Sequence, residues 1–415
     1  MALNTISLQE AEMSQYDTVV VGAGFAGSVV ARRLADNGAR RILILEKRRA
    51  IGGNMFDEYD EAGILVQRFG PHIFHTSEER TWRYLEKFCQ WHPYEHEVKG
   101  AWNGTFFPIP FNLNSLDVVF DESTAQRLAR TLIDTFGEGS EVTVTNLRTF
   151  VDDDLAQVAS FVHENVFTQF TEKQWGLSVD QLDPEVIARV PIRISRDDRA
   201  FTDTFQGVPE GGYSKLFERL LDHPNIDIVL QADATSLFDL HFDEPGIEAP
   251  CSGISIKGQL FPGDIIYTGP LDELFVARFG RLPYRSIDFV YETHTAQHML
   301  PCATVNFIVS ETATRVSEFK RITGQKSNCT TLVKEYPCAY TDAERQVPCY
   351  AILTESSRSH HGRYVALVAQ MPNFHILGRL AEFNYYNMDT IVAKALDLAD
   401  RISDGRIRTS NNSKG

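Results

Sequence analysis

The stretch "YDTVVVGAGFAGSVVARRLADNGARRILILEK", residues 16–47, decides the fold class. Residues 17–21 are mostly β-branched, and residues 42–45 are continuously apolar, as in a strand that is buried on both faces of a parallel sheet. Between these segments, residues 28–37 carry apolar side chains at helical spacing, and Gly38 is suited to ending the helix. The order strand, glycine-rich turn, helix, strand predicts a βαβ unit and therefore an α/β protein.

The glycine-rich turn has the spacing of a dinucleotide site. Gly22, Gly24 and Gly27 form a GxGxxG motif, in which the first glycine allows a tight turn, the second lets a pyrophosphate approach the backbone, and the third lets helix and strand pack closely. The helix that follows offers free backbone N–H groups to phosphates. Glu46 ends the second strand 22 residues after Gly24, where a carboxylate can accept hydrogen bonds from a ribose. The alternative is a tight turn that binds nothing, and the agreement of strand, helix and acid disfavours it.

Two further segments favour FAD over NAD. "IGGN", residues 51–54, follows the acid closely, and a second Gly-Gly at this point is a feature of flavoproteins of the glutathione-reductase-like class. "YTGP", residues 267–270, resembles the Thr-Gly strand end of the same class. The sequence has no second GxGxxG for a separate NAD(P)H domain. We therefore expect a single FAD-binding domain, and not a reductase with two dinucleotide domains.

Size, charge and cysteine usage narrow the function further. The 415 residues suit two or three domains, and the net charge of −16 disfavours a nucleic-acid-binding surface, although a few local arginines suffice for an anionic ligand. The six cysteines show no CxxC spacing and no apolar run reaches transmembrane length, so we expect a cytoplasmic protein without a membrane span or a metal site. Residues 1–15 predict a disordered leader and residues 406–415 a flexible tail.

The residue pattern changes along the chain. Residues 112–188 hold helical patterns such as "STAQRLARTLIDTFG", whereas short β-rich runs such as "ATVNFIVS" and "TTLVKEY" come later. We expect a discontinuous Rossmann-like FAD-binding domain with a helical insert and an antiparallel β-sheet domain above it. The expected ranges are 16–100, 212–270 and 370–405 for the FAD-binding domain, 101–188 for the insert, and 189–211 and 271–369 for the antiparallel sheet that holds the substrate.

Five motifs carry a family resemblance: "RFGPHIFHT" (68–76), "TEKQWG" (171–176), "FQGVPEGGYSKL" (205–216), "IIYTGPLDELF" (265–275) and "GRLAEFNYYNMD" (378–389). Together they resemble the bacterial UDP-galactopyranose mutases, in order, over nearly the whole chain. The resemblance implies an FAD enzyme that interconverts the pyranose and furanose rings of a nucleotide sugar without net redox chemistry. In such an enzyme N5 of the reduced flavin attacks the anomeric carbon and displaces the nucleoside diphosphate. It also implies a homodimer.

The resemblance assigns roles residue by residue. Arg189 and Arg315 match the two arginines that clamp the diphosphate, and His72 matches the histidine beside the flavin. Other matches place the following residues at the substrate: Phe170, Thr171, Trp175, His96, Ala200, Asn306, Tyr350 and Tyr385. Motif and resemblance together place these residues at the cofactor: Gly22, Gly24, Phe25, Gly27, Glu46, Lys47, Gly53, Asn54, His72, Ile73, Arg379, Asn387 and Met388.

Some positions depart from the family pattern. Phe170 and Ala200 stand where the family has tyrosines, His96 stands where it has an asparagine, and Asn387 stands where it has an aspartate. Changed hydrogen-bonding partners imply a changed ligand, so the substrate is UDP-galactose or another nucleotide sugar such as a GDP-hexose. Two other readings remain open: an amine-oxidase-like FAD oxidoreductase, and a flavin-free descendant, because Leu377 stands where the family commonly has a glycine.

Overall fold

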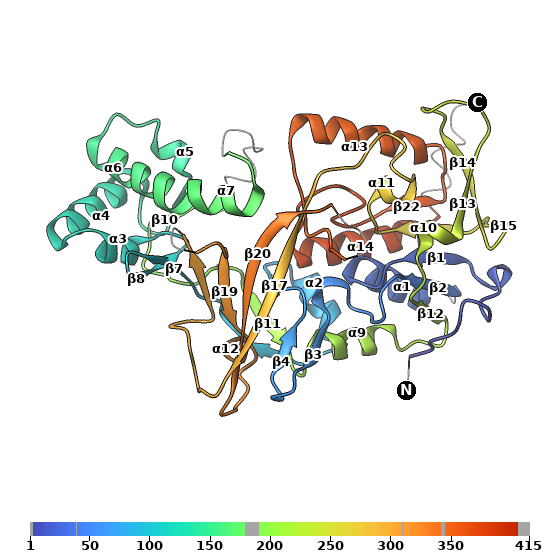
Figure 1. Ribbon diagram of the computed structural model, residues 1–415, viewed down its shortest axis with the longest axis horizontal. Coiled ribbons are helices and arrows are strands. Elements are labelled where there is room, and N and C mark those ends of the chain that lie inside the picture. The colour runs from blue at the N-terminus through green and yellow to red at the C-terminus, as the bar shows by residue number, and fades with distance from the viewer. Residues whose placement is uncertain (1–2, 39, 179–190, 309–310, 342–344, 406–415) are drawn as a thin grey trace.

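The computed structural model describes residues 3–38, 40–178, 191–308, 311–341 and 345–405, and Figure 1 shows its architecture. Arg189 and the expected tail lie outside the described residues. A parallel sheet and a larger, mainly antiparallel sheet each carry helices. The predicted mixed α/β fold class, with a Rossmann-like part, is confirmed.

The parallel sheet has five strands: β12 (Ile226–Leu230), β2 (Ile42–Glu46), β1 (Thr18–Val21), β16 (Asp264–Tyr267) and β22 (Phe374–Ile376), in that spatial order. Every residue of β2 is buried, which explains why this segment is continuously apolar in the sequence. Helix α1 (Phe25–Gly38) carries the chain from β1 to β2 and completes the predicted βαβ unit.

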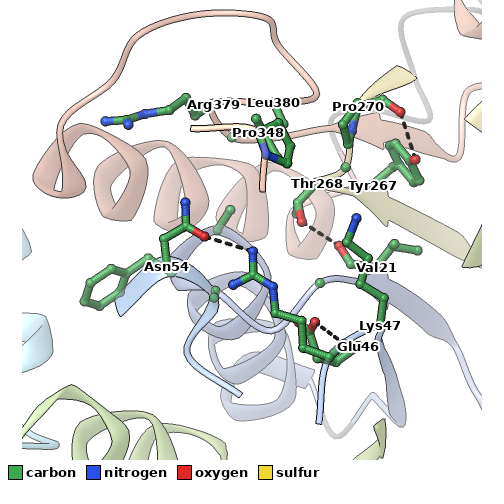
Figure 2. A pocket seen from close by; sticks show the side chains of 18 of the residues that line it. Val21, Glu46, Lys47, Asn54, Tyr267, Thr268, Pro270, Pro348, Arg379 and Leu380 are labelled. Atoms are coloured by element: carbon green, nitrogen blue, oxygen red, sulfur yellow. Dashed lines mark hydrogen bonds between the residues drawn. The ribbon is translucent and has the colours of Figure 1, made fainter. Parts of the chain in front are cut away.

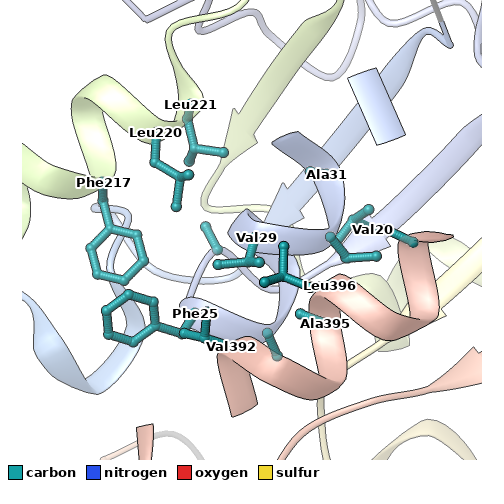
Figure 3. Close-up of a cluster of buried hydrophobic side chains, with 14 of the residues drawn as sticks. Val20, Phe25, Val29, Ala31, Phe217, Leu220, Leu221, Val392, Ala395 and Leu396 are labelled. Atoms are coloured by element: carbon teal, nitrogen blue, oxygen red, sulfur yellow. The ribbon is translucent and has the colours of Figure 1, made fainter. Parts of the chain in front are cut away.

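One face of this sheet is covered by α1, α9 (Tyr213–Leu221) and α14 (Met388–Ser403). Figure 3 shows Phe25 and Val29 of α1 between Phe217 of α9 and Val392 of α14. The rings of Phe25 and Phe217 lie 4.8 Å apart. Burial of each such large side chain contributes about 1.5–3 kcal/mol, so this packing holds the last helix of the chain against the first.

The other face carries a second group of elements. It includes α13 (Glu355–Val368) and a small antiparallel sheet of β13 (Phe238–Phe242), β14 (Cys251–Ile256) and β15 (Gln259–Leu260). Tyr364 and Leu367 of α13 share a buried cluster with Val19 and Leu43 of the parallel sheet. Helix α13 thus packs on the dinucleotide domain, although the sequence analysis assigned its residues to the substrate sheet.

The larger sheet has seven strands in the order β21 (Tyr350–Ala351), β17 (Tyr284–His294), β20 (Thr330–Ala339), β19 (Arg315–Glu318), β18 (Thr304–Phe307), β7 (Val98–Trp102) and β8 (Thr105–Ile109). Neighbouring strands are antiparallel except for β18 and β7. The β7–β8 hairpin belongs to this sheet. The expected domain boundary at residues 100 and 101 is therefore wrong, because it divides a paired strand.

A helical group extends the molecule beyond this sheet. It comprises α3 (Leu113–Val119), α4 (Glu122–Phe136), α5 (Val144–Leu147), α6 (Asp153–Val162), the π-helix η3 (His163–Thr168) and α7 (Gln169–Trp175). Asn112 and Ser115 form a capping box at the start of α3, and Gly176 ends α7 in the left-handed conformation. Figure 1 shows the group at the opposite end of the molecule from α1, α13 and α14, with the seven-stranded sheet between them.

The first residues of the chain are not a disordered leader. Thr5 pairs with Ile228 as a parallel bridge, and the backbone N–H of Ile6 donates to the carbonyl of Ile228 at 3.0 Å. Ala11 and Met13 are buried against the sheet. Residues 3–15 thus cover the outer edge of β12, which would otherwise present unpaired backbone groups.

The remaining elements are short. They are η1 (Met13–Gln15), η2 (Gly53–Met55), β3 (Asp57–Tyr59), β4 (Leu65–Gln67), β5 (Phe74–Thr76), α2 (Glu79–Leu85), β6 (Trp91–Pro93), β9 (Glu141–Val142), β10 (Ile192–Arg193), β11 (Phe205–Pro209), α10 (Ala234–Leu237), α11 (Leu271–Leu274) and α12 (Phe319–Thr323). Among the described residues no helix is long and apolar enough to span a membrane.

Candidate functional site

A pocket opens at the carboxyl ends of β1, β2 and β16, where the strand order reverses around β1. Ligands of open parallel sheets bind at such a position. The pocket also receives residues from η2, from the start of α14 and from the turn at residues 378–380 (Figure 2). We call it the dinucleotide pocket.

The floor of the dinucleotide pocket is formed by the backbone of the glycine-rich turn. Gly22 has φ +98°, and a Cβ there would lie 2.3 Å from Oγ1 of Thr268, whose hydroxyl donates to the carbonyl of Val21 at 2.6 Å. A Cβ on Gly27 would lie 1.9 Å from the carbonyl oxygen of Gly22. Glycine is therefore required at both positions, and the first turn of α1 comes close enough to β1 to present its N–H groups to a phosphate.

Glu46 lies where the sequence places a ribose acceptor, but it already accepts two backbone hydrogen bonds. Its Oε2 accepts from the N–H of Ala23 at 2.7 Å, and its Oε1 accepts from the N–H of Arg48 at 2.9 Å. A carboxylate has about four acceptor positions, so two remain for ribose hydroxyls. Glu46 thus ties the glycine turn to the segment after β2 while it lines the pocket.

Arg48 is a pocket residue that the sequence analysis missed. Its Nη2 donates to Oδ1 of Asn54 at 2.9 Å, as Figure 2 shows at the labelled Asn54. Its Nη1 is buried and has no hydrogen-bond partner among the described residues. A buried guanidinium N–H without a partner suits an anionic ligand. The signal in the sequence was the basic residue two places after Glu46, directly after the predicted Lys47.

His72 lines the same pocket and is held neutral. Its Nδ1 lies 2.9 Å from the carbonyl of Gly70, so Nδ1 carries the proton and Nε2 is free to accept. Burial lowers the pKa of His72 to about 4, and the nearby charge of Arg379 lowers it as well. At neutral pH this imidazole is therefore an acceptor and not a cation.

Arg379 joins the dinucleotide pocket to a second group of side chains. It lines the pocket, and its guanidinium lies 4.6 Å from the ring centre of Tyr385 and 5.7 Å from that of Tyr350. The rings of Tyr350 and Tyr385 are 5.4 Å apart, and the ring of Trp175 lies 5.7 Å from that of Tyr350. We call these four residues the aromatic cluster. All four were predicted site residues, and the structure brings them together from three distant segments.

A row of polar residues crosses the seven-stranded sheet beside the aromatic cluster. Asn306 on β18 lies opposite Arg315 on β19, which lies opposite Glu335 on β20. Directly opposite residues project from the same face of a sheet. Nε of Arg315 lies 3.6 Å from Oε2 of Glu335, and Oδ1 of Asn306 is buried without a partner among the described residues.

The electrostatics of this row keep Arg315 a cation. Burial alone lowers the pKa of Arg315, but Glu335, Tyr350 and Tyr385 reverse the shift and raise it. Burial raises the pKa of Glu335, and Arg315 opposes that change. Glu335 was missed by the sequence analysis, because nothing in "TTLVKEY" distinguishes it from a surface acid of a strand. Its role is visible only through the pairing of β19 with β20.

Three of the four residues that depart from the family pattern, namely Phe170, His96 and Ala200, lie in one region of the structure. The ring of Phe170 lies 5.9 Å from the guanidinium of Arg315, and Thr171 beside it is buried. His96 is buried, and its Nδ1 lies 3.1 Å from the hydroxyl of Tyr94. The N–H of Ala200 donates to the carbonyl of His96, and Arg315 is close enough to contribute to the lowered pKa of His96. These positions therefore lie around Arg315, away from the glycine turn.

A few predicted site residues are placed elsewhere. Ile73 is buried in a small core with Val208 and Ile322 and does not line the dinucleotide pocket. Asn387 is an exposed residue at the start of α14, and its side chain makes no capping hydrogen bond. Its neighbours Tyr386 and Met388 line the pocket, and Tyr386 is a second residue that the sequence analysis missed. Phe25 lines the pocket while it packs in the core.

Taken together, fold and site define a dinucleotide-binding α/β protein whose pocket shares Arg379 with the aromatic cluster, next to Arg315 on a second sheet. The comparisons with known proteins agree with this class. The family model for UDP-galactopyranose mutase matches residues 165–385, and a model for an NAD(P)-binding Rossmann-like domain matches residues 20–88.

Individual proteins are similar over nearly their full length. A UDP-galactopyranose mutase of Mycoplasma pneumoniae is 32% identical over 396 residues, which is 94% of this chain and 96% of the relative. A dTDP-fucopyranose mutase of Escherichia coli is 29% identical over 386 residues, 92% of this chain and 97% of the relative. A crystal structure of reduced UDP-galactopyranose mutase shares the fold, with a TM-score of 0.68 at 14% identity, over 95% of this chain and 97% of that one.

The chain belongs to the UDP-galactopyranose mutase family. It is accordingly an enzyme of the isomerase class, and the resemblance inferred from the five sequence motifs is confirmed.

Proposed function

We propose that the protein uses FAD in its reduced form to interconvert the pyranose and furanose forms of a nucleotide sugar. The observation that carries the proposal is the position of Arg379. It lines the dinucleotide pocket and lies against Tyr350 and Tyr385, both of which are close enough to Arg315 to raise its pKa. A cofactor in the pocket and a diphosphate on Arg315 would thus be brought side by side.

The residues present fit FAD. The glycine floor and the start of α1 suit its diphosphate, Glu46 suits its ribose, and Arg48 offers an unpaired N–H. Gly53, Asn54, His72 and Arg379 would hold the flavin end, where His72 offers Nε2 as an acceptor. A flavin-free descendant would have no use for this set of groups. Leu377, which raised that alternative, is buried in the core below the sheet and does not line the pocket.

Reduced FAD, when bound, supplies a nucleophile for the anomeric carbon of the sugar. The chain supplies the binding and the charge that this reaction needs. Arg315 would neutralise the negative charge that develops as the diphosphate leaves, and the hydroxyls of Tyr350 and Tyr385 would donate to its oxygens. The matching role of Arg189 stays a prediction, since this residue lies outside the described part of the chain. The rings of the aromatic cluster, with the buried Trp175, would exclude water from the sugar.

The identity of the nucleotide sugar is a further part of the proposal. UDP-galactose is one candidate, and another nucleotide hexose, such as a GDP-hexose, is the other. The buried His96, which takes the place of the family's asparagine, supports a changed base preference, because a site built on hydrogen bonds discriminates strongly between ligands. The relative that acts as a dTDP-fucopyranose mutase supports it independently, since the family is not confined to one nucleotide. An amine-oxidase-like reaction would leave the pair of Arg315 and the buried Glu335 without a purpose.

Two measurements test the proposal. The visible spectrum of the purified protein should show flavin, and a colourless protein that takes up no FAD would refute the cofactor. The dithionite-reduced protein is then offered UDP-, GDP- and dTDP-hexoses, and the products are separated as pyranose and furanose forms. We expect ring contraction of at least one nucleotide sugar. Oxygen consumption with an amine and no sugar product would support the oxidoreductase instead.

Assembly and location are further proposals. We propose a homodimer, on the resemblance alone, to be measured by light scattering. We propose a cytoplasmic location because the six cysteines are all free thiols in the structure, as a reducing compartment requires.

A further inference from the structure

A second hollow lies beside the dinucleotide pocket and has no role in the proposed reaction. It is lined by Arg48, Arg49, Ala50, Phe56, Glu58, Arg68 and Phe69. We call it the arginine hollow. Arg48 is shared with the dinucleotide pocket, whereas Arg49 and Arg68 line the arginine hollow alone. Three cations face one carboxylate here, in a chain whose net charge is −16.

Two of the three arginines are held in fixed directions. The guanidinium of Arg48 lies 4.5 Å from the ring centre of Phe69 while its Nη2 donates to Asn54. The guanidinium of Arg68 lies 5.3 Å from the ring centre of Tyr291, and its Nε donates to Oε1 of Glu58 at 2.6 Å. Stacking and hydrogen bonding of this kind remove the rotamer freedom that a ligand would otherwise have to restrict.

Hydrogen-bond donors remain free in the arginine hollow. Arg68 uses only Nε in hydrogen bonds among the described residues, which leaves its two terminal nitrogens. The side chain of Arg49 is 77% exposed and lies 3.9 Å from Glu58, too far for a hydrogen bond. Glu58 can balance only one of the three positive charges that line the hollow. An excess of planar, directed N–H donors is the pattern that recognises phosphate.

We propose that the arginine hollow binds a phosphate-bearing anion of the mononucleotide type, distinct from the cofactor and the sugar substrate. Its phosphate would lie on Arg49 and Arg68, and its ring would rest against Phe56 and Phe69, which line the same hollow. This proposal does not depend on the identity of the cofactor or of the sugar.

The test is a calorimetric titration of the full-length protein with AMP, in the presence of saturating FAD. FAD is added to occupy the dinucleotide pocket, and loss of AMP binding on substitution of Arg49 or Arg68 assigns the remaining binding to the arginine hollow and not to the substrate cleft. Adenosine is the matched ligand without phosphate. We expect saturable AMP binding, no adenosine binding, and about tenfold weaker AMP binding in both Arg49→Ala and Arg68→Gln. Arg83→Ala, an exposed arginine on α2, is the matched control and should bind AMP as the parent does.

The variants also separate a folding defect from a lost contact. Arg49 is exposed and makes one long ion pair within the described part of the chain, so Arg49→Ala should melt at the parent temperature. Absence of AMP binding in the loaded protein would overturn the proposal, because the hollow would then be only a recess of the cofactor pocket. Binding that Arg49→Ala and Arg68→Gln leave unchanged would overturn it as well. If the protein takes up no FAD, the proposed cofactor fails, but the dependence of AMP binding on Arg49 still decides this inference.

Discussion

Arg315 and Glu335 lie directly opposite each other on β19 and β20, with Nε of the arginine 3.6 Å from Oε2 of the glutamate. A Cβ on Gly70 would lie 3.1 Å from Glu335, so the loop that carries His72 rests against this pair. Glu335 therefore connects the proposed diphosphate cation with the flavin-side loop. It would act as a positioning residue, since the groups that face the ligand belong to Arg315 and His72.

Replacing Glu335 by glutamine tests that role. Glu335→Gln keeps the shape but removes the charge that holds Arg315, and a misplaced catalytic group costs about a hundredfold in rate. We expect kcat to fall about 10- to 100-fold while the affinity for FAD is unchanged. Steady-state kinetics of the reduced enzyme and a flavin titration measure the two quantities. Equal loss of FAD affinity and kcat would show that the change disturbs the fold as a whole, and full activity would show that Arg315 needs no partner.

Gly27→Ala should abolish cofactor binding. The added Cβ would lie 1.9 Å from the carbonyl of Gly22, so α1 must move away from β1 and the phosphate-binding turn opens. Overpacking of this kind costs about 1–3 kcal/mol of stability. Thermal melting and the flavin absorbance of the purified variant are the measurements.

Gly362→Ala is the matched control for this substitution. Gly362 lies in α13, and a Cβ there would meet no atom of the described residues within 4 Å. Alanine is a better helix former than glycine by about 1 kcal/mol, so this variant should melt at a higher temperature with its flavin content unchanged. A Gly27→Ala protein that retains full flavin content would contradict the proposed floor of the pocket.

The stability of the protein should fall in acid because of His96. Burial, with the charges of Arg315 and His75, lowers the pKa of His96 to about 3. The unfolded chain takes up this proton near pH 6.5 and the folded chain only near pH 3, so folding becomes less favourable as the pH falls between these values. Above about pH 6.5 His96 does not change the free energy of unfolding as the pH varies.

Urea denaturation at steps between pH 7 and pH 4.5 measures this dependence. The contribution of His96 is at most about 1.4 kcal/mol for each pH unit. His96→Asn should reduce the dependence of the free energy of unfolding on pH, because asparagine does not titrate. An unchanged slope in His96→Asn would show that other groups account for the loss of stability in acid.

Local motifs were the part of this molecule that could be predicted from sequence. The βαβ unit and the glycine turn depend on residues close together in the chain, so their spacing was sufficient. The four residues of the aromatic cluster were predicted through the family resemblance. Their spacing in the sequence alone did not predict that they lie together.

The features that the sequence did not predict depend on contacts between distant parts of the chain. Residues 3–15 resemble an unstructured leader until Thr5 is seen to pair with Ile228. Glu335 looks like a surface acid until β20 pairs with β19, and α13 was given to the wrong domain because its partners are the early strands of the parallel sheet. In each case the deciding contact joins distant parts of the chain or is set by strand register, which single-sequence patterns do not fix.

Asn387 should have no influence on the choice of nucleotide. The absence of the family's acid at this position predicts a changed specificity, but the structure places Asn387 exposed at the start of α14, outside the dinucleotide pocket. Asn387→Asp should therefore leave the ratio of activities on UDP-, GDP- and dTDP-hexoses unchanged. A negative charge at a helix N-terminus is favourable by about 0.3–1 kcal/mol, so the melting temperature should rise slightly. His96→Asn, measured on the same panel, is the comparison in which the ratio should change, because His96 lies near Arg315. A changed ratio in Asn387→Asp with an unchanged ratio in His96→Asn would reverse this assignment and place the base beside α14.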